Sequence, residues 1–472
     1  MNKVAIIGAG SLVFTKQLLN DMFNTECMAG TTYFLMGPTM WKLEKMKQYA
    51  QLLIEKNNID AEIICTTDRR EALKDANFVI LTFLVGGNAA YKYDIEIPLK
   101  YGVDQCIGDS LGPGGVFRML RTAPVIAALG KEVDELCPHA YILNYVNPMG
   151  AVCTTLSRCT KAQVVGLCHG VQTTLDLISG YTGVPKDEIE YINAGINHMD
   201  WFLTLEHNGM DLYPILKEKM EKPEYYKNEK VRGELMRHCG YFMTESSGHL
   251  SEYIPWFRSS QEGLDTYCNE PMFGGETGAA LKFNMAVAEK FKNTDVFSIE
   301  SGELEPRSKE YCSYIIEAIM TDRPFRFSGN ISNKNGSIKN LPLTATVEVP
   351  VYADKYGFHP YNVGELPAHL AAMNMSNISV QELAARAGLD GDTEMAFWAI
   401  AMDPLTSTKL TLKNCRKMAA EMLEAERKWL PQFEGKTLKI IEDVAIPEGT
   451  VGVPVPTDPA LAINERFNKL AQ

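Results

Sequence analysis

The first half of the chain alternates between short apolar segments and longer segments with apolar residues at every third or fourth position. The apolar segments are Lys3–Ile7, Thr32–Met36, Glu62–Cys65, Asn77–Val85, Tyr141–Val146 and Gln163–Leu167. Short, nearly continuous apolar strands separated by helices such as Met40–Lys56 indicate a parallel sheet covered on both faces. The pattern therefore predicts a doubly wound, Rossmann-like α/β domain that binds ligands at the carboxyl ends of its strands.

The pattern changes near residue 195. Ala194–Leu205 has mixed character, Lys339–Tyr352 carries β-branched residues typical of a strand, and Glu382–Ala387 and Leu412–Trp429 have helical periodicity. We expect two domains, a Rossmann-like domain over residues 1–194 and an α+β domain over residues 195–472. Because no repeat, low-complexity tract or Gly/Ser linker separates them, we expect the two to pack closely.

Composition narrows the class of protein. Lys and Arg number 46 and Asp and Glu number 59, which gives a net charge of −13. This acidic balance argues against binding to nucleic acid or to an anionic membrane surface. The apolar runs are too short to span a membrane, and the chain begins directly with a strand, so we expect no signal peptide. The odd count of 11 irregularly spaced cysteines argues against a disulfide framework and favours a reducing cytoplasm.

The first apolar segment ends in a glycine-rich turn, Gly8-Ala9-Gly10-Ser11. Glycines at a strand-to-helix turn let the backbone approach a pyrophosphate, and the helix N-terminus presents free N–H groups to it. We therefore predict a dinucleotide site that includes Gly8, Gly10 and Ser11. The third glycine of the fingerprint is replaced by Val13, and Gly37 stands where an acidic residue would bind the adenosine ribose. NAD and NADP therefore both remain open as cofactors.

Three further segments carry groups suited to chemistry: Gly108–Arg118, Asn144–Met149, and the pair formed by Cys168–Val171 and Gly195–Met199. Cys168 and His198 could supply a thiolate and an imidazole to a divalent metal and leave positions open for substrate. Their separation along the chain does not by itself establish the pair. A buried cysteine and an unrelated histidine remain the alternative.

Together with Gly240–Tyr253, these motifs resemble glycoside hydrolase family four, the NAD- and metal-dependent glycosidases, along nearly the whole chain. Most glycosidases hydrolyse their substrates with two carboxylates, and this family is an exception in which NAD takes part. The resemblance implies NAD and Mn²⁺, or another divalent metal such as Fe²⁺, Co²⁺ or Ni²⁺. It also implies a small-molecule α-glycoside substrate, a homodimer or homotetramer, and a second domain that contributes to the substrate site, the metal site and oligomerisation.

In the mechanism that the resemblance implies, the sugar is oxidised at C3, which acidifies the proton at C2. A base removes that proton, the aglycone leaves from C1 by elimination, and water then adds as the steps reverse. Cys168 and His198 match the metal ligands, and His169 matches the acid that protonates the leaving group. Asp109 matches an acidic residue that makes the base more basic. Asn147 matches a residue that contacts the sugar beside the nicotinamide and so belongs to both binding sites.

The base in enzymes of this kind is usually a tyrosine. We select Tyr253 for this role, with Tyr241 and His249 as alternatives in the same segment. A phenol with a pKa near 10 needs a nearby cation or metal to act as a base at neutral pH. Arg118 and Arg121 are the cations that we consider, since they lie three residues apart on an expected helix.

The motifs give conflicting indications of the substrate branch. Asp109–Arg118, Asn144–Met149 and Thr244–Tyr253 resemble the α-galactosidase branch, whereas Cys168-His169-Gly170 resembles α-glucuronidases and some α-glucosidases. We expect an α-glycosidase for unphosphorylated, α-galactoside-type substrates, with an α-glucuronidase, α-galacturonidase or α-glucosidase as alternatives. An NAD-dependent sugar dehydrogenase, which would release one NADH per turnover, is the alternative from another class, and a non-catalytic sensor is a third.

Overall fold

The first six strands of the computed structural model form a parallel sheet; the structure describes residues 2–293, 295, 302–453, 455–456 and 458–471. The strands are β1 (Lys3–Ile7), β2 (Thr31–Met36), β3 (Ala61–Thr66), β4 (Phe78–Leu81), β5 (Tyr141–Asn144) and β6 (Gln163–Gly166). Their spatial order is β3-β2-β1-β4-β5-β6, and every neighbouring pair is parallel. This is the order of two joined mononucleotide-binding halves, so the predicted Rossmann-like fold is confirmed.

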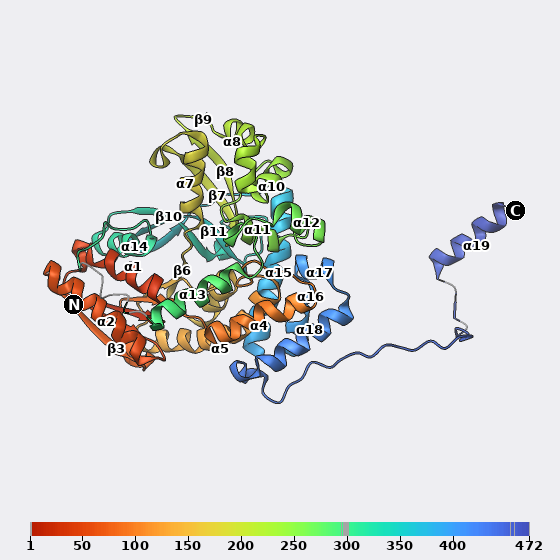
Figure 1. Ribbon diagram of the computed structural model, residues 1–472, viewed down its shortest axis with the longest axis horizontal. Coiled ribbons are helices and arrows are strands. Elements are labelled where there is room, and N and C mark those ends of the chain that lie inside the picture. The colour runs from red at the N-terminus through yellow and green to blue at the C-terminus, as the bar shows by residue number, and fades with distance from the viewer. Residues whose placement is uncertain (1, 294, 296–301, 454, 457, 472) are drawn as a thin grey trace. The chain divides into compact units, whose positions relative to one another are not determined.

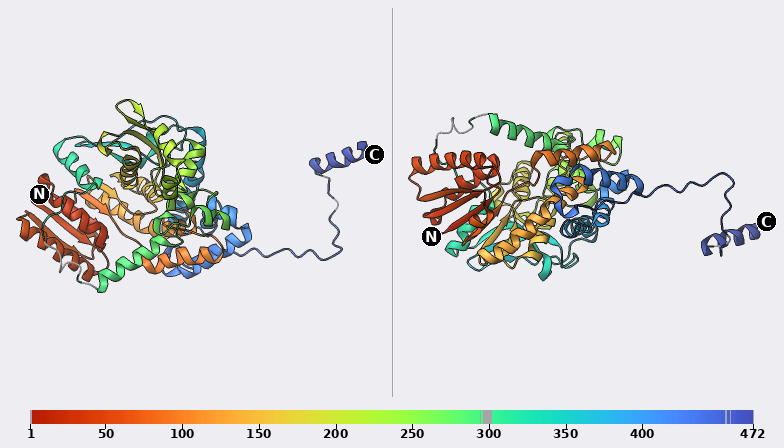
Figure 2. Two further views of the ribbon diagram at one scale, coloured as in Figure 1. Left: turned by 45° about the horizontal axis from the view of Figure 1, so that its top comes forward. Right: turned by 90° about the horizontal axis from the view of Figure 1, so that it is seen from below.

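Helices follow these strands along the chain and lie on both sides of them (Figures 1 and 2). They are α1 (Leu12–Phe23), α2 (Met40–Asn57), α3 (Arg69–Leu73), α4 (Gly87–Lys100), α5 (Gly112–Leu136), α6 (Met149–Cys159) and α7 (Gly170–Thr182). The predicted helix Met40–Lys56 corresponds to α2, which ends where Asn58 adopts a left-handed conformation with φ 53°. The predicted strand Asn77–Val85 is shorter, because the chain leaves the sheet after Leu81 at its carboxyl edge.

The second half of the chain extends the same sheet with antiparallel strands. They are β7 (Glu190–Ile196), β8 (Met199–His207), β9 (Met210–Asp211), β10 (Phe325–Ser332), β11 (Thr346–Asp354) and β12 (Gly357–Pro360). The order continues from β6 as β10-β11-β7-β8-β9, with β12 paired to β11. The mixed segment Ala194–Leu205 is thus a hairpin, and residue 194 lies within β7, inside a sheet to which both halves contribute.

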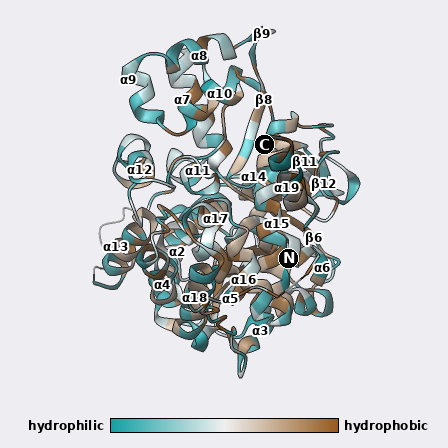
Figure 3. Cartoon of the chain, turned by 90° about the vertical axis from the view of Figure 1, so that its right-hand side faces the viewer, coloured by the Kyte–Doolittle hydropathy of each residue, from teal (hydrophilic) through white to brown (hydrophobic). Residues whose placement is uncertain are grey.

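The remaining helices surround this sheet. They are α8 (Tyr213–Met220), α9 (Pro223–Tyr226), α10 (Arg232–Cys239), α11 (Ser247–Tyr253), α12 (Gln261–Tyr267), α13 (Ala279–Asn293), α14 (Tyr311–Thr321), α15 (Ala368–Asp390), α16 (Thr393–Ala401), α17 (Pro404–Lys409) and α18 (Leu412–Ala425). Figure 3 shows brown, hydrophobic segments around α5 and α15 and mainly teal residues on α12. Gly388 brings α15 close to α5, since a Cβ there would lie 2.6 Å from the Ala123 Cβ.

Residues Lys439–Gln472 form a second compact unit, which contains α19 (Pro459–Ala471). None of the helices in the described part of the chain has both the length and the hydropathy of a membrane span.

Candidate active site

The glycine-rich turn lies at the carboxyl edge of β1, as predicted. Gly8 has φ +100°, and a Cβ there would lie 2.7 Å from backbone atoms of Thr82 and Phe83, which follow β4. The Gly8 and Ala9 N–H groups donate to the Met36 carbonyl at 2.8 and 3.0 Å and so tie the turn to the end of β2. Ser11 caps α1 by accepting from the Phe14 N–H at 3.4 Å. The narrow approach and the capped helix start fit a bound pyrophosphate.

Gly37, at the end of β2, faces this turn. A Cβ on Gly37 would lie 4.0 Å from the Gly10 nitrogen and 3.3 Å from the Leu43 Cδ2. The Lys42 side chain lies along the other side of Gly10, with its Cβ 3.3 Å from the position of a Gly10 Cβ. A lysine stem, instead of a carboxylate from the end of β2, therefore lies beside the turn at the adenosine side of the predicted site.

The sheet brings Cys168 and His198 together although they lie on different elements. Cys168 follows β6, and His198 lies in the turn between β7 and β8, where its φ is +62°. Glu245 completes the group, with its Oε2 3.7 Å from the Cys168 Sγ and 3.8 Å from the His198 Nε2. One ligand atom from each residue lies within 4.8 Å of the others. A sulfur, a nitrogen and an oxygen donor thus converge as they do in catalytic sites for divalent transition metals.

Glu245 is a candidate ligand that we did not predict. It precedes α11 within the resembling segment Gly240–Tyr253, but its position in the sequence gives no sign that it faces Cys168. Burial alone would raise the Glu245 pKa. His249, His198 and His169 outweigh the effect of burial and lower the pKa to about 2. The Cys168 pKa is raised well above its ordinary value by burial and by the Glu245 and Glu348 carboxyls. A cation at this point would therefore be needed to deprotonate the thiol.

The other ring nitrogen of His198 faces two hydroxyls. His198 Nδ1 lies 3.2 Å from the Ser110 Oγ and 3.1 Å from the Tyr253 hydroxyl. For Nε2 to offer its lone pair toward Cys168 and Glu245, the ring proton must be on Nδ1. Nδ1 then donates a hydrogen bond to one of these two oxygens. Burial and the neighbouring His249 lower the pKa of His198 to about 4, so the ring is neutral at neutral pH.

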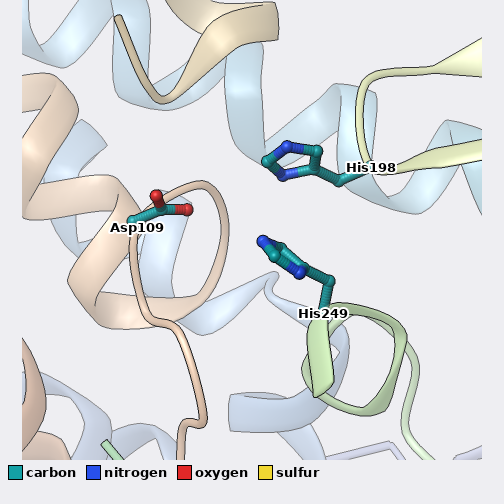
Figure 4. A group of neighbouring side chains, drawn as sticks. All are labelled: Asp109, His198 and His249. Atoms are coloured by element: carbon teal, nitrogen blue, oxygen red, sulfur yellow. The ribbon is translucent and has the colours of Figure 1, made fainter. Parts of the chain in front are cut away.

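A second group adjoins the first through His198. Ligand atoms of Asp109, His198 and His249 also lie within 4.8 Å of one another, and Figure 4 shows the three side chains converging from a loop, a hairpin turn and α11. The Asp109 Oδ2 accepts from the Asn147 Nδ2 at 2.9 Å and lies 3.5 Å from the Arg118 Nη1. Burial acts to raise the pKa of Asp109, but Arg118 and His198 outweigh it and lower the pKa, so Asp109 is a carboxylate.

A model for the family 4 glycosyl hydrolases matches residues 3–183, and a model for the C-terminal domain of that family matches residues 193–406. The chain is 38% identical to an α-galactosidase of Bacillus subtilis, over 92% of this chain and 100% of the relative. It is 36% identical to an α-galactosidase of Rhizobium meliloti, over 91% of this chain and 89% of the relative. The chain belongs to family 4 of the glycosyl hydrolases.

A solved structure described as a 6-phospho-α-glucosidase from gut microorganisms, in complex with NAD and Mn²⁺, shares the fold of this family 4 hydrolase. The TM-score is 0.75 at 20% identity, over 91% of this chain and 99% of that one. At this identity the likeness bears on the fold.

The structure separates the three residues considered as the base of this family 4 hydrolase. Tyr253 is buried against His198, and burial, Asp109 and Glu252 raise its pKa well above 10. The His249 ring centroid lies 4.5 Å from that of His198. Tyr241 instead packs against Tyr213 and His369, with centroid distances of 6.1 Å to each. Tyr253 and His249 therefore lie beside His198, whereas Tyr241 makes its ring contacts with other residues.

His169 and the two arginines are placed differently from one another. His169 caps α7 next to Cys168, its side chain is 56% exposed, and its Nδ1 lies 3.5 Å from the Glu310 Oε1. Arg118 reaches Asp109 in the site. Arg121 instead forms ion pairs with Asp94 and Glu426, and its side chain is fully buried there. Of the two cations predicted to lie near the base, the structure brings Arg118 to the site.

Proposed function

We propose that this protein is an NAD- and divalent-metal-dependent α-glycosidase that cleaves unphosphorylated, α-galactoside-type substrates. The reaction would proceed by oxidation at C3, deprotonation at C2, elimination of the aglycone and addition of water, after which C2 would be protonated and C3 reduced again, so that NAD is regenerated. The observation that carries the proposal is the convergence of Cys168, His198 and Glu245 at the carboxyl edge of a dinucleotide-binding sheet. Two-carboxylate hydrolysis does not call for a thiol and an imidazole at one point, whereas a metal site does.

The residues present fit both cofactors. The turn from Gly8 to Ser11 would hold the pyrophosphate of NAD, and Asn147 would reach the sugar beside the nicotinamide. Cys168, His198 and Glu245 would hold the metal and leave further positions for substrate oxygens. When bound, NAD supplies a hydride acceptor at C3, and the metal stabilises negative charge on the oxygens of C2 and C3 as a Lewis acid.

The remaining side chains would move and place protons. Asp109 is a carboxylate held by Asn147 and Arg118, and it lies within 4.8 Å of His198 and His249 through their ligand atoms. This negative charge strengthens a base nearby, which we assign to Tyr253 with His249 as the alternative. His169, adjacent to Cys168 and partly open to solvent, would protonate the departing oxygen. An imidazole suits this role because it exchanges protons near neutral pH.

An uncharged galactoside is favoured over a uronide or a phosphorylated sugar by the relatives that the chain resembles. The curated relatives at 36–38% identity over most of the chain are α-galactosidases.

The proposal is tested with aryl α-galactoside, α-glucoside, α-glucuronide and α-galacturonide substrates, assayed with NAD and Mn²⁺ under reducing conditions. We expect cleavage of the galactoside, no net accumulation of NADH, and solvent deuterium at C2 of the released sugar. Cleavage with C2 hydrogen fully retained would contradict the elimination mechanism. Preferential cleavage of a uronide would contradict the substrate class, and one NADH per turnover would indicate a dehydrogenase instead.

A further inference from the structure

A row of residues crosses five strands directly beneath the metal ligands. The register aligns Gly166 of β6 with Asn330 of β10, Asn330 with Glu348 of β11, Glu348 with Gly195 of β7, and Gly195 with Asp200 of β8. Directly paired residues of neighbouring strands project to the same face of a sheet. The row therefore places Asn330, Glu348 and Asp200 on one face. Asn330 and Glu348 lie between the strand that leads to Cys168 and the hairpin that carries His198, and Asp200 lies on that hairpin.

The three polar side chains of this row are buried to 0–1% exposure, which is unusual for two carboxyl groups in one sheet. Gly166 makes room at one end, since a Cβ there would lie 2.9 Å from the Asn330 Cβ. Gly195 makes room between Glu348 and Asp200, since a Cβ there would lie 2.7 Å from the Asp200 Cα. Burying a carboxyl without full hydrogen bonding costs free energy, so its presence calls for a role beyond packing.

One hydrogen bond links the row to the proposed metal site. The Asn197 Nδ2 donates to the Glu348 Oε2 at 3.5 Å. Asn197 immediately precedes His198 in the β7–β8 turn, where the His198 φ is +62°. The Asn197 Oδ1 and the Glu348 Oε1 are buried and have no hydrogen-bond partner. Glu348 on β11 thus holds the residue before His198 through the amide nitrogen of its side chain.

We propose that Glu348 is a positioning residue for the metal centre: it holds the Asn197 amide and, through it, the β7–β8 turn that presents His198. The inference rests on the proposed function, because it takes Cys168 and His198 as ligands. Residues outside a metal's ligand set orient the ligands and tune their affinity. Without the Glu348 acceptor, the Asn197 side chain loses its hydrogen bond to β11, and the turn that carries His198 is held less firmly.

The test uses Co²⁺ bound to the full-length protein, because Co²⁺ bonded to a thiolate gives a near-ultraviolet charge-transfer band. We expect the wild type to show the band and Cys168→Ser to lose it. Glu348→Met, which has similar length and no oxygen acceptor, should weaken Co²⁺ binding about 10- to 100-fold and reduce the band. Thr346→Val is the matched control, since Thr346 lies two residues earlier on β11, is buried and bonds through its side chain to the Thr154 Oγ1 at 2.9 Å. It should leave the titration unchanged.

A double-mutant cycle separates positioning from the charge of Glu348. If Glu348 acts through Asn197, then Asn197→Ser alone should cause a similar loss, and adding Glu348→Met to it should cause little more. Additive losses, or full recovery by Glu348→Asp, which keeps the charge but shortens the reach, would overturn the inference. If the Glu348 variants do not unfold cooperatively, a normal band in Asn197→Ser would overturn it as well.

The two proposals fail in different ways. A wild type without the charge-transfer band, or a Cys168→Ser variant that retains it, would overturn the metal site and with it the proposed function. A band that depends on Cys168 but is unchanged in Glu348→Met would overturn the positioning role alone.

Discussion

The predicted cofactor turn and the proposed metal centre are built in contrasting ways. The turn from Gly8 to Ser11 consists of consecutive residues between β1 and α1, and its closest tertiary contacts come from the ends of the adjacent strands β2 and β4. The metal centre draws Cys168, His198 and Glu245 from three elements, two of which are separated in the sheet by β10 and β11. The first site is a local motif, and the second exists only when the whole sheet has assembled.

The contrast bears on how each site tolerates change. A site made by one turn is damaged chiefly by a residue whose backbone cannot adopt that turn. A site made by sheet order also depends on residues that touch no ligand, such as those that hold the loops and strands in register. Substitutions in both sites test this difference, beginning with the largest expected effect.

Cys168→Ser should lower metal-dependent kcat/KM by about 1000-fold, because loss of a metal ligand removes several kcal/mol of transition-state stabilisation. The assay is aryl α-galactoside cleavage over a range of Mn²⁺ concentrations, with circular dichroism as the check on folding. Cys415→Ser, at a buried cysteine of α18, is the control and should keep its activity. Equal activity of wild type and Cys168→Ser across the range would remove Cys168 from the metal centre.

The second prediction concerns Glu252, which holds the loop before Asp109. Its carboxyl accepts from the N–H groups of Cys106, Ile107 and Gly108 at 2.8, 3.0 and 2.9 Å. Burial raises the Glu252 pKa to about 7 despite these hydrogen bonds. Since the folded-state pKa lies above the unfolded value, the group's stabilising contribution is full below about pH 4.5 and is lost as the pH rises through about 7.

Unfolding free energies measured in urea from pH 4.5 to pH 8 test this sign. Relative to Glu252→Gln, which cannot titrate, the wild type should lose at most about 3 kcal/mol over the range. Parallel pH profiles for the two proteins would show that folding does not raise the pKa of Glu252. A long-range contact would then hold the Asp109 loop without the pH sensitivity that we expect.

The same contrast explains what the sequence could predict. All six parallel strands were predictable because a strand buried on both faces is apolar throughout, and the local turn after β1 was predictable with them. β10 was not, because its buried face carries Ser328 and Asn330, which break the apolar pattern. β11 begins only at Thr346, later than the predicted Lys339, since the preceding residues form loops and turns.

The residues of the candidate site also divide into those that the sequence could predict and those that it could not. Cys168 and His198 could be singled out by residue type and by resemblance, but the geometry that joins them comes from the pairing of β6 with β10 and of β11 with β7. Glu245 and Glu348 become neighbours of the ligands only through that pairing. No periodicity within either segment encodes a contact across so long a stretch of chain, so both residues were missed.

At the cofactor turn, Gly8→Ala should lower the free energy of unfolding by about 2 kcal/mol, through a strained φ and a clash with backbone. Gly183→Ala is the control, because Gly183 has φ +77° but nothing within 4 Å of an added Cβ. It should cost about 1 kcal/mol for the φ alone. Urea unfolding gives both values, and NAD titration should show weaker binding only in Gly8→Ala. Equal costs would mean that the close approach to Thr82 and Phe83 does not restrict this position.

The smallest effect concerns the adenosine side of the turn. Because Gly37 offers no carboxylate and Lys42 lies beside Gly10, the dissociation constants of NAD and NADP should differ by no more than about tenfold. Gly37→Asp should increase discrimination against NADP, since the new carboxylate can bind the ribose hydroxyls and repels a 2′-phosphate. The Leu43 Cδ2, 3.3 Å from the added Cβ, has to move by only a few tenths of an ångström.

Lys42→Met, which removes a positive charge and keeps the stem, should weaken NADP more than NAD. Calorimetric titration of each variant with both cofactors measures the ratio. A wild type that already prefers NAD more than about 100-fold would mean that another group has taken over the role of the missing carboxylate, and the adenosine side would then depend on distant residues just as the metal centre does.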